Sequence, residues 1–306
     1  MILAAGEALV DLVVGFDGSI DAHPGGAPFN VCRTIARLDR SAAFLGALSD
    51  DRFGMTLGSA LAAEGVDLSA VVHVTLPTTI ALADLDENGA ATYHFYAEGT
   101  SASAVDGAAA VAALKLAPTA LHVGTLGLVL EPLATTMRAL VDGVSTDVLV
   151  FLDPNCRPTV TTDRDRYLAT VAHCARRADV IKVSDEDLAF LAPGEDPVQA
   201  TRSLLRGGAV GLVTRGAEAV TIVTADRTAD VAVPPVTVVD TVGAGDGFGG
   251  AFLAYWDERG LGRADVDDLS RLVDAVRFGV HVAAEICERA GADPPRRSEV
   301  AERVTK

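Results

Sequence analysis

Cysteine is scarce in this 306-residue sequence, and the four cysteines are far apart. They form no C-x-x-C pair, so their spacing indicates neither a zinc site nor a disulfide framework. We therefore expect free thiols in a reducing, cytoplasmic compartment. Aromatic residues are also few, at 5%, whereas hydrophobic residues make up 49% of the chain. A core of that size must be mostly aliphatic, and it is large enough for an α/β domain.

Basic residues are few relative to acidic ones, with 25 Lys and Arg against 42 Asp and Glu and a formal net charge of −17. Nucleic acids and anionic membranes both require clustered Lys and Arg, so this balance disfavours both as partners. No apolar run is long enough to span a membrane. The first residues contain Glu7 and Asp11 and no basic region, and we expect two strands there rather than a signal peptide.

The glycine-rich stretch from 236 to 255 carries the strongest functional pattern. Residues 236–239 are β-branched and predict a strand, 243–247 are rich in glycine, and 248–255 have an apolar helical pattern. A strand, glycines and a helix start in this order direct backbone N–H groups at an anion, and the helix dipole adds to the attraction. We therefore expect a phosphate to bind at this turn.

Asp246 places a carboxylate where the phosphate would lie. Repulsion makes this costly unless the carboxylate has a chemical role, such as accepting the proton of a hydroxyl that attacks phosphorus. The alternative is that Asp246 only caps the helix. Gly245–Gly250 fits G-x-G-x-x-G, but no second strand with a ribose-binding acid follows, and the chain has no Gly-Lys-Ser/Thr triplet. Neither a dinucleotide fold nor a P-loop is expected.

Strand and helix patterns alternate regularly after residue 120. Strands are predicted at 121–123, 148–152, 180–183 and 210–214, with helices at 131–142, 164–175 and 197–206 between them. This order predicts a parallel sheet covered by helices, with ligands at the carboxyl ends of the strands. A hairpin around Asn88-Gly89 interrupts the alternation, and together with residues 9–20 it predicts a small separate sheet.

Polar residues at these strand ends are candidate ligands, and each also has a local alternative. Asp153-Pro154-Asn155 is typical of a turn, with Arg157 close by. Ser184 and Asp187 fit a helix N-cap with acids in the first turn. Thr214-Arg215-Gly216 is compatible with a simple loop. Gly25-Gly26, which precede a predicted helix that carries Asn30, are also compatible with an ordinary loop. Asp11 interrupts an apolar strand and is either exposed on a sheet edge or directed into a site.

Two segments resemble the ribokinase-like (PfkB) family of sugar kinases. Asp240-Thr241-Val242-Gly243-Ala244-Gly245-Asp246 is similar to the family's C-terminal signature, and Gly25-Gly26-Ala27-Pro28-Phe29-Asn30-Val31 is similar to its N-terminal glycine pair. The similarity runs from Gly6 to about Gly291. It implies a single three-layer α/β/α domain over residues 1–306, with a mainly parallel central sheet and a lid sheet formed from about 9–22 and 76–99. In the family this lid is often a homodimer contact.

The resemblance also implies a role for each site residue. Asp246 would be the base, with the backbone N–H groups of Gly243, Ala244, Gly245 and Asp246 around the transferred phosphoryl group. The sugar would contact Asp11, Gly25, Gly26, Asn30 and Asp246. The nucleotide would contact Ser184, Asp187, Thr214, Arg215, Gly216, Gly243 and Gly245. ATP would carry Mg²⁺, placed in part by Asp187, and Asp240 matches a position that helps to bind a monovalent cation such as K⁺.

The substrate is expected to be a neutral sugar, with fructose first. The segments around Asn30, 122–132, 153–158 and 182–188 are more similar to fructokinases than to ribokinases. The alternative is a kinase for 2-keto-3-deoxygluconate or for another sugar or nucleoside. A sugar acid needs a cation in the lid, but residues 93–98 contain Glu98 and no arginine. A further alternative is a non-catalytic sensor of sugar or nucleotide on the same scaffold, because Ser184 and Asp187 differ from the family's N-x-x-E pattern.

Overall fold

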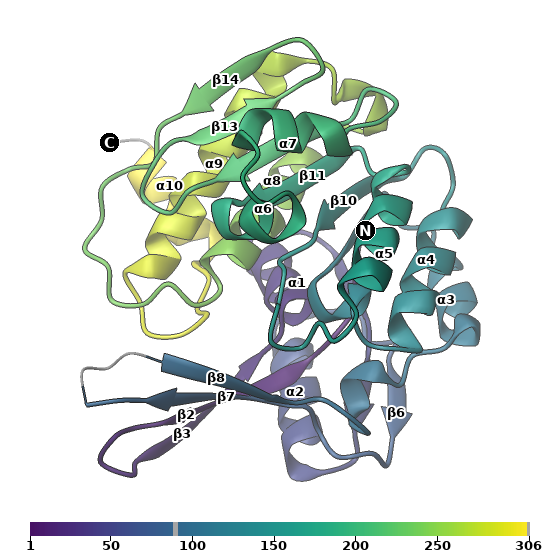
Figure 1. The fold of residues 1–306 in the computed structure, drawn as a ribbon, viewed down its shortest axis with the longest axis vertical. Helices are drawn as coiled ribbons and strands as arrows, with labels where there is room; N and C mark the ends of the chain where they lie inside the picture. The colour runs from purple at the N-terminus through teal and green to yellow at the C-terminus, as the bar shows by residue number, and fades with distance from the viewer. Residues whose placement is uncertain (88–90, 305–306) are drawn as a thin grey trace.

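The computed structural model describes residues 1–87 and 91–304, and its centre is an eight-stranded sheet (Figure 1). The strand order is β14-β13-β12-β11-β10-β9-β1-β4. The six strands from β12 to β4 are parallel, and β13 and β14 extend that sheet as an antiparallel edge. The strands are β1 (Ile2–Ala5), β4 (Ala42–Leu45), β9 (Ala120–Gly124), β10 (Leu149–Asp153), β11 (Val180–Ser184), β12 (Val210–Thr214), β13 (Val220–Val223) and β14 (Thr228–Val231).

Helices cover both faces of this sheet, because both sets of alternating side chains along its strands are apolar. In β1, for example, Ile2 and Ala4 belong to one hydrophobic cluster, and Leu3 and Ala5 belong to the other. The first face is covered by α1 (Ala27–Arg37), α2 (Arg52–Ala63), α8 (Ala244–Glu258) and α9 (Leu269–Cys287). The second is covered by α3 (Gly107–Leu114), α4 (Leu133–Gly143), α5 (Arg164–Ala175), α6 (Asp185–Leu191) and α7 (Pro197–Leu204). The predicted three-layer α/β/α class is confirmed.

A smaller four-stranded sheet projects from this body beside the start of α1 (Figure 1). Its order is β3-β2-β7-β8, formed by β2 (Leu9–Val14), β3 (Ile20–Gly25), β7 (Ile80–Leu85) and β8 (Ala91–Tyr96). The central pair β2 and β7 is parallel, and the two outer pairs are antiparallel. The predicted small sheet therefore exists. The Asn88-Gly89 turn expected between its last two strands lies outside the described residues.

One predicted strand is absent from the structure. Residues 236–239 form no strand, because no neighbouring strand pairs with them and Pro234 and Pro235, just before them, supply no N–H donors. Val238 and Val239 are therefore left 59% and 62% exposed. After β4, Gly46 is followed by the short β5 (Ala47–Ser49), which pairs with β6 (Val72–Val74) in a separate two-stranded sheet. The last helix of the described residues is α10 (Arg297–Val304), which follows α9.

Within residues 1–87 and 91–304, none of the helices has both the length and the apolar composition needed to cross a bilayer.

Candidate active site

The amino end of α8 forms the glycine-rich turn that the sequence predicted as a phosphate site. Gly243 is the N-cap residue and has a left-handed backbone, with φ of 76°. A Cβ atom on Gly243 would lie 2.5 Å from the Ala292 side chain, so this position requires glycine for two reasons. The N–H of Ala244 donates to the Thr241 carbonyl at 3.2 Å. Among the described residues, the N–H groups of Gly245 and Asp246 find no acceptor, as expected for a first helical turn.

Asp246 lies in that first turn and is directed toward another helix. Its Oδ2 atom accepts a hydrogen bond from Nδ2 of Asn30 on α1, at 2.9 Å and across 216 residues of sequence. Asp246 is 9% exposed and Asn30 5% exposed. Since Gly243 is the N-cap residue, the alternative in which Asp246 only caps α8 is wrong. The amino ends of α1 and α8 therefore meet at one buried carboxylate.

The glycine pair before α1 makes room for two acidic residues. A Cβ atom on Gly25 would lie 2.0 Å from Oδ2 of Asp11, on the adjacent strand β2. A Cβ atom on Gly26 would lie 2.8 Å from the backbone oxygen of Glu7, and Gly26 has φ of 105°. Gly25 ends β3 and Gly26 is the N-cap residue of α1, so neither belongs to an ordinary loop.

Asp11 belongs to the same electrostatic environment as Asp246. Its strand β2 lies between β3 and β7, so the expectation of an exposed residue on an edge strand is wrong. Burial raises the pKa of Asp11 to about 7, and repulsion from Asp246 and Asp240 adds to the rise, while Arg157 opposes it. Asp246 therefore acts electrostatically on Asp11 and is bonded directly to Asn30, and the contact of all three with a sugar stays a prediction.

A buried ion pair under the glycine turn was missed at the sequence level. Nζ of Lys182 in β11 lies 3.1 and 2.9 Å from the two carboxylate oxygens of Asp153 at the end of β10. It also lies 3.4 Å from the position that a Cβ atom on Gly245 would occupy. Burial alone would lower the pKa of Lys182, but the carboxylates of Asp153, Asp187 and Asp246 outweigh it and raise that pKa. A charged lysine therefore lies directly beside the predicted phosphate site.

Glu7 was also missed. It is 1% exposed, and Oε1 accepts the N–H of Ala27, the first residue of α1, at 3.1 Å. Burial raises the pKa of Glu7 to about 8, with a further contribution from Asp246. An acid between two apolar strands was the available sequence signal, and its partner could not be known without the fold.

Ser184 and Asp187 form a helix capping box. Ser184 Oγ accepts the N–H of Asp187, and Asp187 Oδ2 accepts the N–H of Ser184, while Oδ1 accepts the N–H of Cys156 at 2.6 Å. The capping alternative is therefore confirmed for both residues. The described residues contain no cluster of three or more His, Cys, Asp or Glu side chains suited to a metal ion. The Mg²⁺ role of Asp187 stays a prediction.

The remaining candidates lie at the same carboxyl edge of the sheet. Thr214 ends β12 and pairs with Ser184 in β11. Arg215 donates to Thr221 Oγ1 at 2.7 Å and pairs with Glu218, and Gly216 follows with φ of 54°. Their nucleotide contacts stay predictions.

Asp240 ties the glycine turn to the end of α9. Oδ1 accepts the N–H of Val242 at 3.0 Å, and Oδ2 accepts the N–H of Gly291 at 2.8 Å. Both oxygens hold the turn in place, and the cation role of Asp240 stays a prediction. Asn155 donates to Thr125 Oγ1 at 3.2 Å, so it joins two neighbouring strand ends rather than only closing its own turn.

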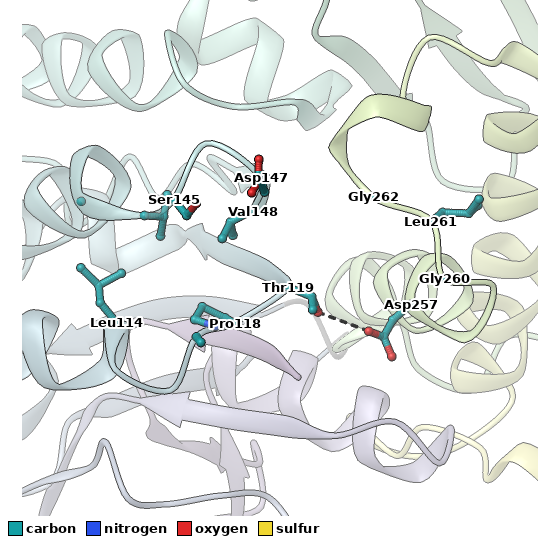
Figure 2. Close-up of a pocket in the computed structure, with 13 residues that line it drawn as sticks. Leu114, Pro118, Thr119, Ser145, Asp147, Val148, Asp257, Gly260, Leu261 and Gly262 are labelled. Carbon is teal, nitrogen blue, oxygen red and sulfur yellow. Dashed lines mark hydrogen bonds between the residues drawn. The ribbon is translucent and has the colours of Figure 1, made fainter.

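A cavity of about 710 Å³ lies at the other end of the molecule (Figure 2). Its lining includes Pro118 and Thr119 just before β9, Val148 just before β10, and Asp257 near the end of α8. Asp257 follows Asp246 by eleven positions in one helix, which places it about 16 Å away along the axis. This cavity is therefore separate from the Asn30 and Asp246 pair.

Known proteins are similar to this chain in both sequence and fold. The model of the pfkB family carbohydrate kinase matches residues 10–298. A fructokinase of Rhizobium leguminosarum bv. trifolii is 37% identical over 260 residues, covering 83% of this chain and 79% of that protein. Fructokinase-1 of Oryza sativa subsp. japonica is 30% identical over 318 residues, covering 98% and 95%.

Two solved structures are similar over almost their whole length. Fructokinase from Xylella fastidiosa with bound ATP has a TM-score of 0.90 at 27% identity, with 99% of this chain and 98% of that chain covered. Fructokinase from Vibrio cholerae O395 in a form with fructose, ADP and calcium ion has a TM-score of 0.85 at 26% identity, with 98% and 97% covered. The family predicted from the two glycine-rich segments is confirmed: the chain belongs to the pfkB family of carbohydrate kinases.

Proposed function

We propose that this protein is an ATP-dependent fructokinase. The observation that carries the proposal is the hydrogen bond between Asn30 and Asp246, which joins the amino ends of two helices at a buried carboxylate. Relatives named fructokinase at 37% and 30% identity support fructose as the sugar. The structures of such enzymes with ATP, and with fructose and ADP, support the two ligands.

In this mechanism Asp246 accepts the proton of the sugar hydroxyl as its oxygen attacks the γ-phosphorus. The bond between that phosphorus and the bridging oxygen breaks, and ADP leaves. The free N–H groups of Gly245 and Asp246 and the dipole of α8 stabilise negative charge on the transferred group. Lys182 adds a positive charge next to Gly245. Gly243 and Ala244 shape the turn, and Ala244 already donates to Thr241.

The sugar would lie between the small sheet and α1. Asp11 and Asn30 supply carboxylate and amide groups for its hydroxyls, and Gly25 and Gly26 let the backbone approach it. The small sheet would act as a lid that excludes water. Exposed apolar residues on and beside that sheet, Phe16, Ile20, Tyr93 and Tyr96, support a homodimer contact there, since they are 74%, 65%, 52% and 60% exposed.

ATP would occupy the carboxyl edge of the sheet, next to Ser184, Thr214, Arg215 and Gly216. Mg²⁺ would enter with ATP, and Asp187 would help to place it, since each of its carboxylate oxygens accepts one backbone hydrogen bond and keeps a second lone pair. K⁺ near Asp240 is a further proposal, and a fructokinase of Vibrio cholerae has been solved with potassium ion. We place the reaction in the cytoplasm, where ATP is available.

A coupled assay of ADP release with fructose, ribose and 2-keto-3-deoxygluconate tests the proposal. Fructose should have the highest kcat/KM, by about 10-fold or more, because a site built to pair sugar hydroxyls rejects sugars that leave its polar groups unpaired. A preference for 2-keto-3-deoxygluconate would show that the substrate is the sugar acid rather than fructose, and the protein would still be a sugar kinase. Sugar binding measured by calorimetry, with no turnover of any sugar, would favour the sensor.

Replacing Asp11 by Asn should weaken sugar binding selectively. Hydrogen bonds to a charged carboxylate contribute about 1.5–3 kcal/mol, so the KM for fructose should rise about 10- to 100-fold while the KM for ATP stays the same. The pKa of Asp11 is about 7, and its charged form is the better acceptor. Fructose affinity of the wild-type protein should therefore improve as the pH rises through 7, and that of the variant should stay flat.

The matched control is Asp21→Asn, an exposed position in the same sheet. It should keep the wild-type fructose KM and its pH dependence. An unchanged KM in Asp11→Asn would remove Asp11 from the sugar site.

A further inference from the structure

Glu7 lies at the point where the two halves of the proposed site meet. It follows β1 and is 1% exposed, and its backbone oxygen packs against Gly26, the N-cap residue of α1. Gly26 offers no side chain to cap α1, and the first turn of α1 carries no acidic residue. Glu7 takes that place from outside the helix, since its Oε1 atom accepts the N–H of Ala27 at 3.1 Å.

The other carboxyl oxygen of Glu7 has no hydrogen-bond partner among the described residues. Oε2 is buried, and so is the equally unpartnered Oδ1 of Asn30, one turn further along α1. The Nδ2 atom of Asn30 donates to Asp246 at 2.9 Å. A buried carboxyl group, the helix start that it holds and the amide that holds the predicted base therefore form one connected arrangement.

We propose that Glu7 is a positioning residue for the transfer step: its carboxyl group fixes the amino end of α1, so that Asn30 holds Asp246 in line with the sugar hydroxyl. This inference rests on the proposed kinase function. Glu7 contacts neither Asp246 nor Asn30 through a hydrogen bond, and it acts through Ala27 and the first turn of α1.

The neighbouring charges determine whether the Glu7 carboxyl group is neutral or ionised when it holds the amino end of α1. The charged groups that act on it are Asp246 and Arg157, and the effect of Asp246 is the larger. Burial, followed by repulsion from Asp246, raises the pKa of Glu7 to about 8, so the carboxyl group is mainly neutral at pH 7. Ionisation would place a second negative charge beside Asp246, where the incoming phosphoryl group is also negative. Turnover should therefore fall as the pH rises through 8.

The test compares wild type with Glu7→Gln, Glu7→Ala and the exposed control Glu195→Gln. Glu7→Gln keeps an oxygen for the Ala27 N–H and resembles the neutral carboxyl group, whereas Glu7→Ala removes both oxygens. Displacement of a catalytic group by about 1 Å can cost about 10²-fold, so Glu7→Ala should lower kcat by about 10- to 100-fold at pH 7, with the KM for ATP within about twofold of wild type. Glu7→Gln should restore most of that loss.

The pH profile separates a positioning role from a merely structural one. Wild type and Glu195→Gln should lose kcat above pH 8, by about tenfold per pH unit at the limit, and Glu7→Gln should not. The inference is overturned if Glu7→Ala keeps kcat within about twofold of wild type, or if Glu7→Gln loses activity above pH 8 as wild type does.

Thermal unfolding without substrates gives a readout independent of activity. The native protein holds a proton on Glu7 that the unfolded chain releases above its ordinary pKa of 4.5. Wild-type stability should therefore fall relative to Glu7→Gln as the pH rises from 4.5 to 8 and then level off. A difference in Tm that does not change with pH would overturn the inference. Absence of turnover in the wild-type protein would overturn the proposed function instead, and the unfolding experiment would still test Glu7.

Discussion

Replacing Asp246 by Asn should lower kcat for sugar phosphorylation by about 10³-fold, within the range by which a positioned general base accelerates a reaction. The amide cannot accept the hydroxyl proton at neutral pH, so the attacking oxygen keeps that proton in the transition state. The new side chain has the same shape, and the Asn30 amide can rotate so that its Oδ1 atom accepts a hydrogen bond from the new NH₂ group. ATP affinity measured by calorimetry should stay within about twofold of wild type, because the backbone N–H groups of the turn are retained.

Asp257→Asn is the matched control, since it lies in the same helix and its carboxylate pairs with Arg40 rather than with the site. It should leave kcat unchanged, although it removes an equal amount of negative charge from α8. A near-normal rate in Asp246→Asn, measured with saturating fructose and ATP, would mean that Asp246 is not the base. A loss of ATP affinity as large as the loss of kcat would indicate that the turn itself had been disturbed.

Much of the site could be predicted because its turns need glycine, and few positions in a protein require that residue. Gly25, Gly26 and Gly243 stand where a Cβ atom would clash with a neighbouring group, and each was recognised as part of a glycine-rich turn before a helix. Asp246 was recognised because a carboxylate beside a phosphate is repelled by it, which is costly unless the carboxylate has a chemical role. The parallel sheet was predicted from apolar runs that alternate with helical patterns.

The failures have a common cause, which is that they depend on partners distant in sequence. Residues 236–239 have a strand composition, but no neighbouring strand is available to them, and Val238 and Val239 remain exposed. Glu7 resembled an ordinary polar residue between two strands until α1 was placed over it. Lys182 gave a stronger signal that was overlooked: it is one of three lysines in the sequence, and it stands between Ile181 and Val183 in an apolar strand. A lysine there needs a buried acid.

Replacing Lys182 by Met should cause a large loss of stability. Lys182 and Asp153 have side chains that are 5% and 1% exposed, and removing one partner leaves the other charge buried without compensation. Breaking such a pair costs about 3–5 kcal/mol, which should appear as a lower free energy of unfolding in a urea titration. Burial already raises the pKa of Asp153 to about 6 despite Lys182. Without the lysine this pKa rises further, so the native protein holds a proton that the unfolded chain releases, and the loss of stability should grow as the pH rises.

Two controls separate this electrostatic cause from a packing defect. Lys115→Met removes an exposed lysine and should change the free energy of unfolding by no more than about 0.5 kcal/mol. The double variant Lys182→Met with Asp153→Asn removes both charges, and it should recover most of the loss because a neutral pair of similar volume has no unpaired charge. If the double variant is as unstable as Lys182→Met alone, the lysine stabilises the sheet through its packing. If it recovers stability but still binds ATP more weakly than wild type, the positive charge beside Gly245 contributes to nucleotide binding as well as to the fold.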